Sequence, residues 1–144
     1  MSAGTYGSLM YPRVMEALTK HHFSFEDITL LGFERRAILG KKYPGLRQNS
    51  ESSVNGRIWF EVDEASTRIL DRFEDPLYER RTVEILSSTR GLIEARAYVV
   101  PAQLEHTLAE EPWDQDSFEK IHLAQYVLMC GRFRADVIGK NEDV

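Results

Sequence analysis

Hydrophobic and polar residues alternate in three stretches of this chain, and this period of two constrains the fold more than any other feature. In GRIWFEV, the side chains of Ile58, Phe60 and Val62 share one face. RRTVEIL and LIEARAYVV alternate in the same way and are joined by the short connection Ser87–Gly91. Such alternation is typical of β-strands, and the short glycine-containing connection predicts a hairpin. DITLLGFERRAIL adds one or two short strands around Gly32.

Two turns are expected next to these strands. In YPG, at Tyr43–Gly45, proline suits the second position of a turn and glycine can adopt a positive φ at the third. Asn55-Gly56 favours a tight turn directly before GRIWFEV. Both motifs therefore predict a change of chain direction.

Other segments follow the period of a helix. Proline is favoured at the first helical position, so a helix is predicted over Pro12–Leu18. In DEASTRILDRFED, Asp63 can cap a second helix, which Pro76 ends. The apolar residues of both segments recur on one face, as in helices that pack against a core.

DSFEKIHLAQYVLMCG predicts a longer helix that Asp116 or Ser117 can cap and Gly131 can close. The elements then run strand, helix, strands, helix, hairpin, helix. This order predicts an α+β fold rather than a repeated βαβ arrangement, with strands that could curl into a small barrel. The length of 144 residues fits one domain over residues 1–144.

Composition and charge exclude several classes of function. The net charge of −5 disfavours a nucleic-acid-binding protein. No apolar run approaches the ~20 residues that cross a bilayer, so no membrane partner is expected. MSAGTYGSLM has neither a basic nor an apolar region of a signal peptide, which favours a cytoplasmic protein. The sequence carries no signal for an oligomeric state.

Cysteine and histidine give no metal site. The single cysteine, Cys130, excludes an internal disulfide and a multi-cysteine metal site. Cys130 stands in a hydrophobic helix, where an inert core residue is expected. The four histidines lack zinc-binding spacing.

Basic residues gather in one segment with no acid among them: Arg35, Arg36, Lys41, Lys42 and Arg47. A solvated strand and turn is the simpler interpretation. The alternative is a positive rim that attracts an anionic small molecule.

The helix predicted after Asp63 has three acids in its last turns, Asp71, Glu74 and Asp75. Carboxylates there face the negative end of the helix dipole, which costs ~0.3–1 kcal/mol each. Glu74 borders the apolar stripe and can be partly buried. Burial and the dipole would both raise the pKa of Glu74 and make it a competent general base. The alternative is a solvated residue paired with one of the arginines at 80 and 81.

The segment TYGSLMYP connects a predicted strand to the helix at Pro12. Backbone N–H groups near a helix N-terminus can bind a carboxylate or an oxyanion. Gly7 permits close approach by a ligand, and Ser8 adds a hydroxyl. A plain strand-to-helix turn is the alternative. Trp59, Tyr78 and Tyr98 are candidates to line a pocket, although aromatic residues in strands more often pack in a core.

Seven stretches run in one order along the chain: YGSLM at 6–10, GF.R at 32–35, YPG at 43–45, SVNGRIWFEV at 53–62, LDRFED at 70–75, Y.RRTVEI at 78–85 and A.AYV at 95–99. Together they resemble the γ-glutamylcyclotransferase-like family, and within it the branch named after the plant avirulence-induced gene. The segment from Trp113 to Gly131 is similar to the C-terminal helical extension of the plant-type branch.

The resemblance implies a small mixed β-barrel with flanking helices and a pocket at one side. Enzymes of the family act on γ-glutamyl compounds: the α-amine attacks the γ-carbonyl, giving 5-oxoproline and releasing an amine or amino acid. No metal or organic cofactor takes part. The substrate-binding loop of the family maps to Tyr6, Gly7, Ser8 and Leu9, and its catalytic glutamate to Glu74. The implied partner is a small γ-glutamyl-like substrate, whose α-carboxylate Arg35 is a candidate to offset.

Two features depart from the family pattern. The first strand, SAGT, is less apolar than is usual, and Leu9 replaces a polar residue of the glutathione-linked branch. The substrate of that branch therefore does not transfer to this chain. A non-catalytic module that keeps the pocket for a metabolite or a protein partner is the alternative function.

Overall fold

The structure is a computed structural model that describes residues 2–74 and 76–142, with side chains as far as residue 138. Asp75, one of the acids singled out above, lies outside the described residues. The elements are, in chain order, β1 (Ala3–Thr5), the 3-10 turn η1 (Ser8–Met10), α1 (Pro12–Thr19), β2 (Phe25–Ile38), β3 (Pro44–Trp59), α2 (Glu64–Phe73), β4 (Glu79–Ser87), β5 (Gly91–Val99), the 3-10 segment η2 (Ala102–Thr107), β6 (Leu108–Pro112), α3 (Gln115–Ser117), the π-helical segment η3 (Phe118–His122) and α4 (Leu123–Glu142).

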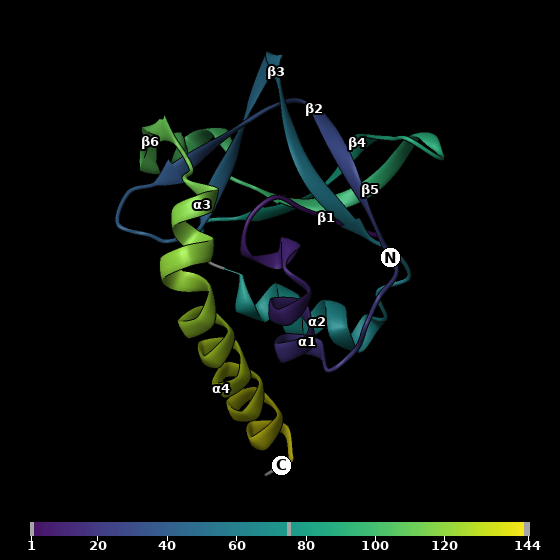
Figure 1. Ribbon diagram of the computed structural model, residues 1–144, viewed down its shortest axis with the longest axis vertical. Coiled ribbons are helices and arrows are strands. Elements are labelled where there is room, and N and C mark those ends of the chain that lie inside the picture. The colour runs from purple at the N-terminus through teal and green to yellow at the C-terminus, as the bar shows by residue number, and fades with distance from the viewer. Residues whose placement is uncertain (1, 75, 143–144) are drawn as a thin grey trace.

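Five of the strands close into a barrel. They follow one another in the order β3-β1-β5-β4-β2, and β2 pairs with β3 to complete the ring. β6 pairs with the C-terminal end of β2. Only β1 and β5 run parallel among these pairings, so the barrel is mixed. The expected α+β fold with a small mixed barrel is confirmed, and Figure 1 shows α1, α2 and α4 grouped on one side of it.

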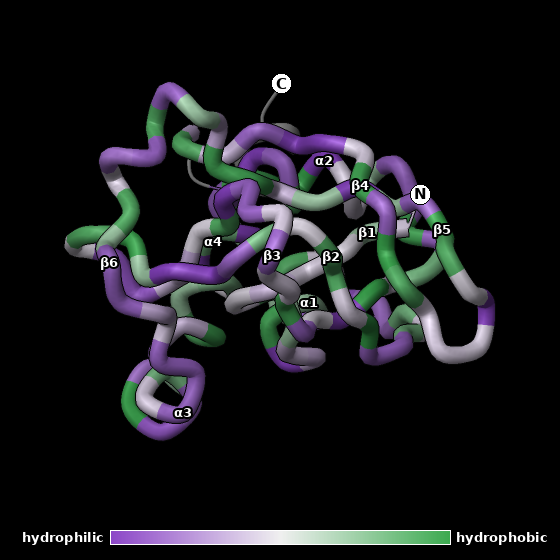
Figure 2. Tube along the Cα trace, turned by 90° about the horizontal axis from the view of Figure 1, so that it is seen from above, coloured by the Kyte–Doolittle hydropathy of each residue, from purple (hydrophilic) through white to green (hydrophobic). Residues whose placement is uncertain are grey.

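Residues of the strands contribute to two hydrophobic clusters. One fills the barrel and contains Ile58, and the other lies between the barrel and the helices and contains Trp59. Neighbouring residues of β3 thus face opposite sides, as strand geometry requires. Figure 2 shows the corresponding changes between hydrophobic and hydrophilic colour along the strands. At this end of β3 the alternation therefore reflects two cores, whereas in β4 and β5 buried residues alternate with exposed ones.

The first two helices begin where the sequence predicts. α1 starts with Pro12 in its first turn. The Asp63 carboxylate caps α2 by accepting a hydrogen bond from the Ser66 N–H at 3.1 Å. α2 ends at Phe73, so Glu74 stands directly at its C-terminal boundary.

The predicted turns at YPG and Asn55-Gly56 are wrong. Pro44 and Gly45 lie in β3 opposite Ala37 and Arg36, and the chain turns earlier, where Gly40 has φ +74°. At Gly45, an added Cβ would lie 2.6 Å from the Leu108 side chain, so the glycine serves close packing.

Asn55 and Gly56 also lie within β3, opposite Thr29 and Ile28. The partner strand β2 is one continuous strand whose register shifts between Leu31 and Phe33. Gly32 has φ +83° at this shift, which is a β-bulge of the kind that glycine favours. β2 and β3 are consequently both longer than the strands predicted from the pattern.

The C-terminal helix differs from its prediction at both ends. Asp114, rather than Asp116 or Ser117, supplies the cap by accepting from the Ser117 N–H at 2.9 Å. Gly131 does not close the helix, which continues to Glu142. Residues beyond Gly131 hold it in place, since the Arg134 guanidinium donates to the Leu18 carbonyl at the end of α1 at 2.8 Å. Figure 1 shows α4 running alongside the other helices, away from the barrel.

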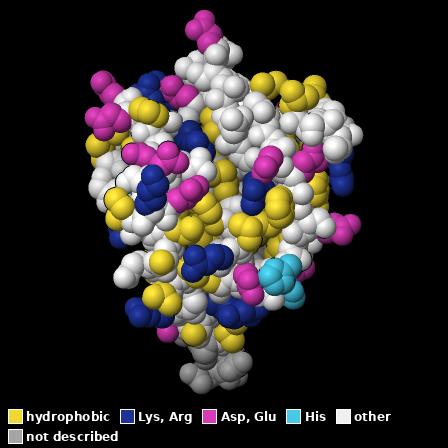
Figure 3. All heavy atoms as spheres, viewed as in Figure 1, with side chains coloured by type: hydrophobic (Ala, Val, Ile, Leu, Met, Phe, Trp, Pro, Cys, Tyr) yellow, Lys and Arg dark blue, Asp and Glu magenta, His cyan; other side chains and the backbone are white. Residues whose placement is uncertain are grey.

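The described surface is mixed in charge. Figure 3 shows acidic and basic side chains interspersed on the viewed face, with hydrophobic side chains gathered near its centre. Within residues 2–74 and 76–142, we find no helix that is long and apolar enough to span a membrane.

Candidate active site

A narrow cleft brings the loop after β1 against the end of α2. Its volume is about 40 Å³. The cleft is lined by all five residues that the sequence singles out, Tyr6, Gly7, Ser8, Leu9 and Glu74, together with Gly4, Thr5, Tyr43, Pro44, Leu46, Tyr78 and Tyr98. Residues far apart in the sequence therefore meet in one place.

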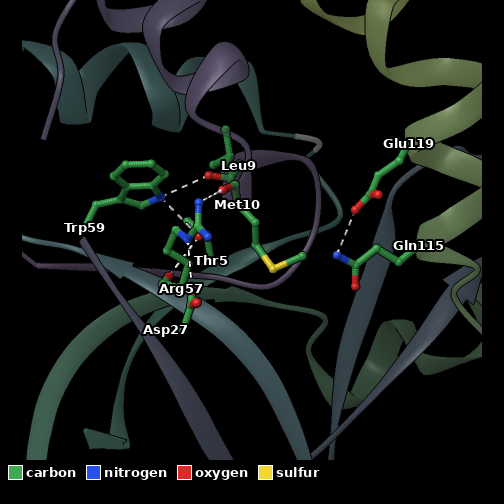
Figure 4. A network of polar contacts seen from close by, with 8 residues as sticks. All are labelled: Thr5, Leu9, Met10, Asp27, Arg57, Trp59, Gln115 and Glu119. Atoms are coloured by element: carbon green, nitrogen blue, oxygen red, sulfur yellow. Dashed lines mark hydrogen bonds and ion pairs between the residues drawn. The ribbon is translucent and has the colours of Figure 1, made fainter. Parts of the chain in front are cut away.

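Side chains of β2 and β3 hold the backbone carbonyls of the loop. The Arg35 guanidinium donates to the Tyr6 carbonyl at 2.8 Å. The Trp59 indole N–H donates to the Leu9 carbonyl at 3.0 Å and, at 3.2 Å, to the hydroxyl of Thr5. Arg57 donates to the Met10 carbonyl at 3.1 Å and pairs with Asp27 at 3.0 Å, as Figure 4 shows. The loop is thus fixed from the barrel side.

This arrangement leaves the first N–H groups of the loop available. In a trans peptide the C=O and the following N–H point in opposite directions, so the Gly7 N–H points away from Arg35. The Met10 N–H donates to the Gly7 carbonyl at 3.0 Å, which closes the 3-10 turn η1. The N–H groups of Gly7, Ser8 and Leu9 precede that bond and have no partner within the turn, as at any helix start. They are the donors that the loop can offer to an anionic group.

Two residues of the loop, Gly7 and Ser8, do something other than expected. The room left by Gly7 is taken by the Pro44 ring, because an added Cβ would lie 2.6 Å from its Cδ. The Ser8 hydroxyl donates to the Tyr126 hydroxyl of α4 at 3.0 Å in a buried contact. Glycine and serine therefore shape the loop through packing with the protein.

Tyr6 and Leu9 are anchors of the loop. The Tyr6 ring belongs to the barrel core, and burial raises the pKa of its phenol well above the usual value. Among the described side chains, the Tyr6 hydroxyl is the buried polar atom without a hydrogen-bond partner. Leu9 is 4% exposed and belongs to the core between barrel and helices. The loop is consequently anchored in the barrel core by Tyr6 and in the core between barrel and helices by Leu9.

Glu74 stands half-buried where α2 ends. Its N–H still donates to the Leu70 carbonyl at 3.0 Å, and its backbone is then extended. Burial, followed by the nearby Glu74 charge, raises the pKa of the Cys130 thiol to about 12. Burial, the hydrogen bond from the Ser8 hydroxyl to the Tyr126 oxygen and the Glu74 charge also act on the pKa of Tyr126, which is raised overall. Glu74 therefore lies near helix α4 as well as near the loop, and it lines a space beside each of them.

A polar group of side chains adjoins Glu74 on its other side. The Tyr98 hydroxyl donates to Asp71, which also pairs with Arg80 at 2.8 Å. Burial, then this hydrogen bond and the Asp71 and Glu74 charges, raise the pKa of Tyr98. Arg80 thus has Asp71 as an ion-pair partner, and Arg81 pairs with Glu79 at 3.0 Å.

A family model described as "Gamma-glutamyl cyclotransferase, AIG2-like" matches residues 5–115, a span that contains both the loop and Glu74. The chain belongs to this family. AIG2-like protein D of Arabidopsis thaliana is 28% identical over 138 residues, which are 94% of this chain and 90% of that protein. AIG2-like protein C of the same plant is 29% identical over 129 residues, 89% of this chain and 74% of that protein.

Solved structures show the same fold as this chain of the AIG2-like family. A solution structure of an Arabidopsis thaliana protein has a TM-score of 0.69 at 21% identity, covering 99% of this chain and 87% of the other. A γ-glutamyl cyclotransferase has a TM-score of 0.61 at 17% identity, covering 69% of this chain and 66% of the other. A mouse AIG2-like protein has a TM-score of 0.55 at 21% identity, with 78% and 87% covered.

In this AIG2-like chain, the basic segment does not line the cleft as a rim. Arg35 is bonded to the loop carbonyl and stacks over the Trp113 ring at 5.1 Å. Arg36 and Arg47 both pair with Glu34. Arg35 is absent from the lining described above and positions the loop through the Tyr6 carbonyl, and its role toward a substrate carboxylate stays a prediction.

The aromatic candidates from the sequence and the YPG stretch relate to the cleft in different ways. Tyr78 and Tyr98 do line the cleft. Trp59 does not line it, and its indole N–H instead donates to the Leu9 carbonyl of the loop. Tyr43 and Pro44 line it too, although their sequence indicates only a turn. Their position in the YPG stretch, one of the seven that carry the family resemblance, is the signal that could have found them.

Proposed function

We propose that this protein is a γ-glutamyl cyclotransferase-type enzyme. It converts a γ-glutamyl compound into 5-oxoproline and releases an amine or amino acid, with Glu74 as general acid and base. The observation that carries the proposal is the shared cleft of the loop and Glu74. Membership of the γ-glutamyl cyclotransferase, AIG2-like family supports it independently.

The loop supplies the electrostatic part of the reaction. The N–H groups of Gly7, Ser8 and Leu9 would donate to the γ-carbonyl oxygen, which gains negative charge when the α-amine attacks. Preorganised donors stabilise such charge because they need no reorganisation during the reaction. The bonds from Arg35, Trp59 and Arg57 keep the loop in that orientation.

Glu74 moves the protons. The α-ammonium of the substrate must lose a proton before its nitrogen can attack, and the carboxylate of Glu74 accepts it. A bond forms between the α-nitrogen and the γ-carbon, and the bond from the γ-carbon to the leaving nitrogen breaks. Protons lost by the α-nitrogen are delivered to the leaving nitrogen, so the reaction consumes no water and no redox partner. A positioned acid and base of this kind contributes roughly 10²–10⁴-fold to the rate.

Replacement of Glu74 by glutamine tests the proposal. Purified protein should release 5-oxoproline from at least one member of a panel of γ-glutamyl amino acids and amines. Glu74→Gln keeps the shape and removes the base, so we expect kcat to fall roughly 10²–10⁴-fold. The matched control is Glu64→Gln at the other end of α2, where the side chain is 86% exposed and pairs with Arg68.

Circular dichroism and thermal unfolding should show that both variants fold like the parent. Turnover by Glu74→Gln equal to that of Glu64→Gln would overturn the assigned role. A compound that binds unaltered, with no turnover across the whole panel, would instead support the non-catalytic binding module.

A further inference from the structure

An apolar cavity opens beside Glu74, on the side of helix α4. Its volume is about 340 Å³, compared with about 40 Å³ for the narrow cleft. Tyr43 and Glu74 line both spaces, so the two adjoin at the proposed base. The other walls of this cavity include Phe73 from α2 and three side chains of α4, Tyr126, Met129 and Phe133.

Ring contacts fix the walls of the cavity. The Phe73 ring stands edge-on to Tyr126, with centroids 5.9 Å apart and planes at 87°. It meets Phe133 in the same manner at 5.4 Å and 71°. Such edge-to-face contacts are favourable arrangements of aromatic pairs, so the cavity has preformed apolar walls. Preformed walls of this kind suit an apolar group rather than a charged one, because an unpaired charge there would lose its hydration.

The position of the cavity relates it to one end of the substrate. The leaving nitrogen must lie next to Glu74 to receive a proton, and the rest of the leaving group extends from that nitrogen. Arg72, in the last turn of α2, also lines the cavity and can pair with a carboxylate. We propose that the leaving group is an amino acid with a large apolar side chain, which enters this cavity while its carboxylate meets Arg72. The inference rests on the proposed cyclotransferase function and names its substrate class.

A polar cavity of about 390 Å³ also borders Glu74 and is the competing location. Its lining includes Asp71, Arg80 and Tyr98. These groups already bond one another through Asp71, as described above. A polar leaving group would favour that side, so the two locations predict opposite substrate preferences.

A pair of substrates and a pair of variants separate the possibilities. The parent protein should turn over γ-glutamyl-phenylalanine with a kcat/KM at least ~10-fold above that for γ-glutamyl-alanine, since apolar groups in a fitted pocket discriminate by 10-fold or more. Met129→Lys places a charge in the cavity wall at a residue that is 45% exposed. We expect this variant to lose about 10-fold in kcat/KM for γ-glutamyl-phenylalanine and to stay within about twofold for γ-glutamyl-alanine.

Leu128→Lys is the matched control, because Leu128 is the preceding residue of α4, is 58% exposed and lies outside this cavity. Leu128→Lys should leave kcat/KM unchanged for both substrates. Equal use of the two substrates, with Met129→Lys behaving like Leu128→Lys, would overturn the apolar leaving-group site and leave the cyclotransferase function intact. A preference for γ-glutamyl-lysine or γ-glutamyl-glutamate would overturn it in favour of the polar cavity. Failure to release 5-oxoproline from any of these compounds would overturn the underlying function as well.

Discussion

Glu26 on β2 joins that strand to the turn between β4 and β5. Its carboxylate accepts hydrogen bonds from the hydroxyls of Ser87, Ser88 and Thr89, at 2.7, 3.0 and 2.9 Å. The bond from Ser87 is the largest cause of a lowered pKa of Glu26, about 2 instead of 4.5. A carboxyl group with a lower pKa in the folded state stabilises the fold above its unfolded pKa, and this contribution disappears as the pH falls through the folded value.

We therefore expect Glu26→Gln to be less stable than the parent near neutral pH. The difference in the free energy of unfolding should shrink as the pH falls from about 4.5 towards about 2. Urea unfolding at a series of pH values measures it. Glu84→Gln, an exposed position of β4, controls for the loss of one surface charge. A difference between parent and Glu26→Gln that is independent of pH would contradict the expectation.

Single residues of the candidate site were only partly predictable. Acids at a helix end depart from a simple local rule, whereas a glycine-containing segment before a helix is also an ordinary turn, so the family resemblance was needed to assign the loop and Glu74 to one site. The role of Arg35 was not predictable, since a basic residue in a strand can face a ligand or a backbone carbonyl. The Ser8 contact with Tyr126 joins residues at opposite ends of the chain, and no local pattern reports it.

At the scale of elements, two glycines make a contrasting pair. A Cβ added to Gly56 in β3 would lie 2.3 Å from the Tyr6 ring and 2.5 Å from the Thr5 carbonyl oxygen. The backbone oxygen cannot move aside without disturbing β1, which pairs with β3 at this point. We expect Gly56→Ala to lower the free energy of unfolding by about 1–3 kcal/mol, as overpacking does in other cores.

Gly131→Ala is the control for that substitution. Gly131 lies inside α4, and an added Cβ would have no atom within 4 Å. Alanine is favoured over glycine within a helix by roughly 0.5–1 kcal/mol, so Gly131→Ala should stabilise the protein. Urea unfolding of both variants compares the two signs directly. Destabilisation by both substitutions would contradict the packing argument, because it would point to a general intolerance of alanine.

The same residues explain which elements the sequence could predict. Periodicity identified the helices and the β4–β5 hairpin, because burial on one face repeats at every turn or every second residue. The turns at YPG and Asn55-Gly56 were wrong because glycine has two uses. At Gly45 and Gly56 it provides space for a neighbouring element, and that neighbour is known only once the fold is known.

At the scale of the whole molecule, closure of the barrel was the least local feature. β1 has three residues, yet it bridges β3 and β5 and completes the ring. Strand pairing between distant segments leaves no periodic signal, so the barrel was implied chiefly by the family resemblance. Helix α4 likewise packs on α1, and its face formed by Tyr126, Cys130 and Phe133 makes the wall of the helical core.

Two tyrosine hydroxyls connect the N-terminal part of the fold to its C-terminal helices. The buried Tyr126 hydroxyl accepts from Ser8, and the Tyr11 hydroxyl donates to the exposed Glu119 at 2.8 Å. Removal of one partner from a buried hydrogen bond leaves the other unsatisfied, which costs about 1–3 kcal/mol. An exposed bond can be replaced by water. Tyr126→Phe should therefore lower the free energy of unfolding by about 1–3 kcal/mol, and Tyr11→Phe by less than about 1 kcal/mol.

A double-mutant cycle attributes the Tyr126 effect to the Ser8 contact. If the hydroxyls act through one another, Ser8→Ala should cost little in a Tyr126→Phe background, and the coupling between the two sites should be about 0.5–1.5 kcal/mol. Additive losses would mean that each hydroxyl acts separately. Because Ser8 belongs to the loop of the candidate site, the coupled result would make α4 a support of that loop. The rate of 5-oxoproline release should then fall in Tyr126→Phe and stay close to the parent value in Tyr11→Phe.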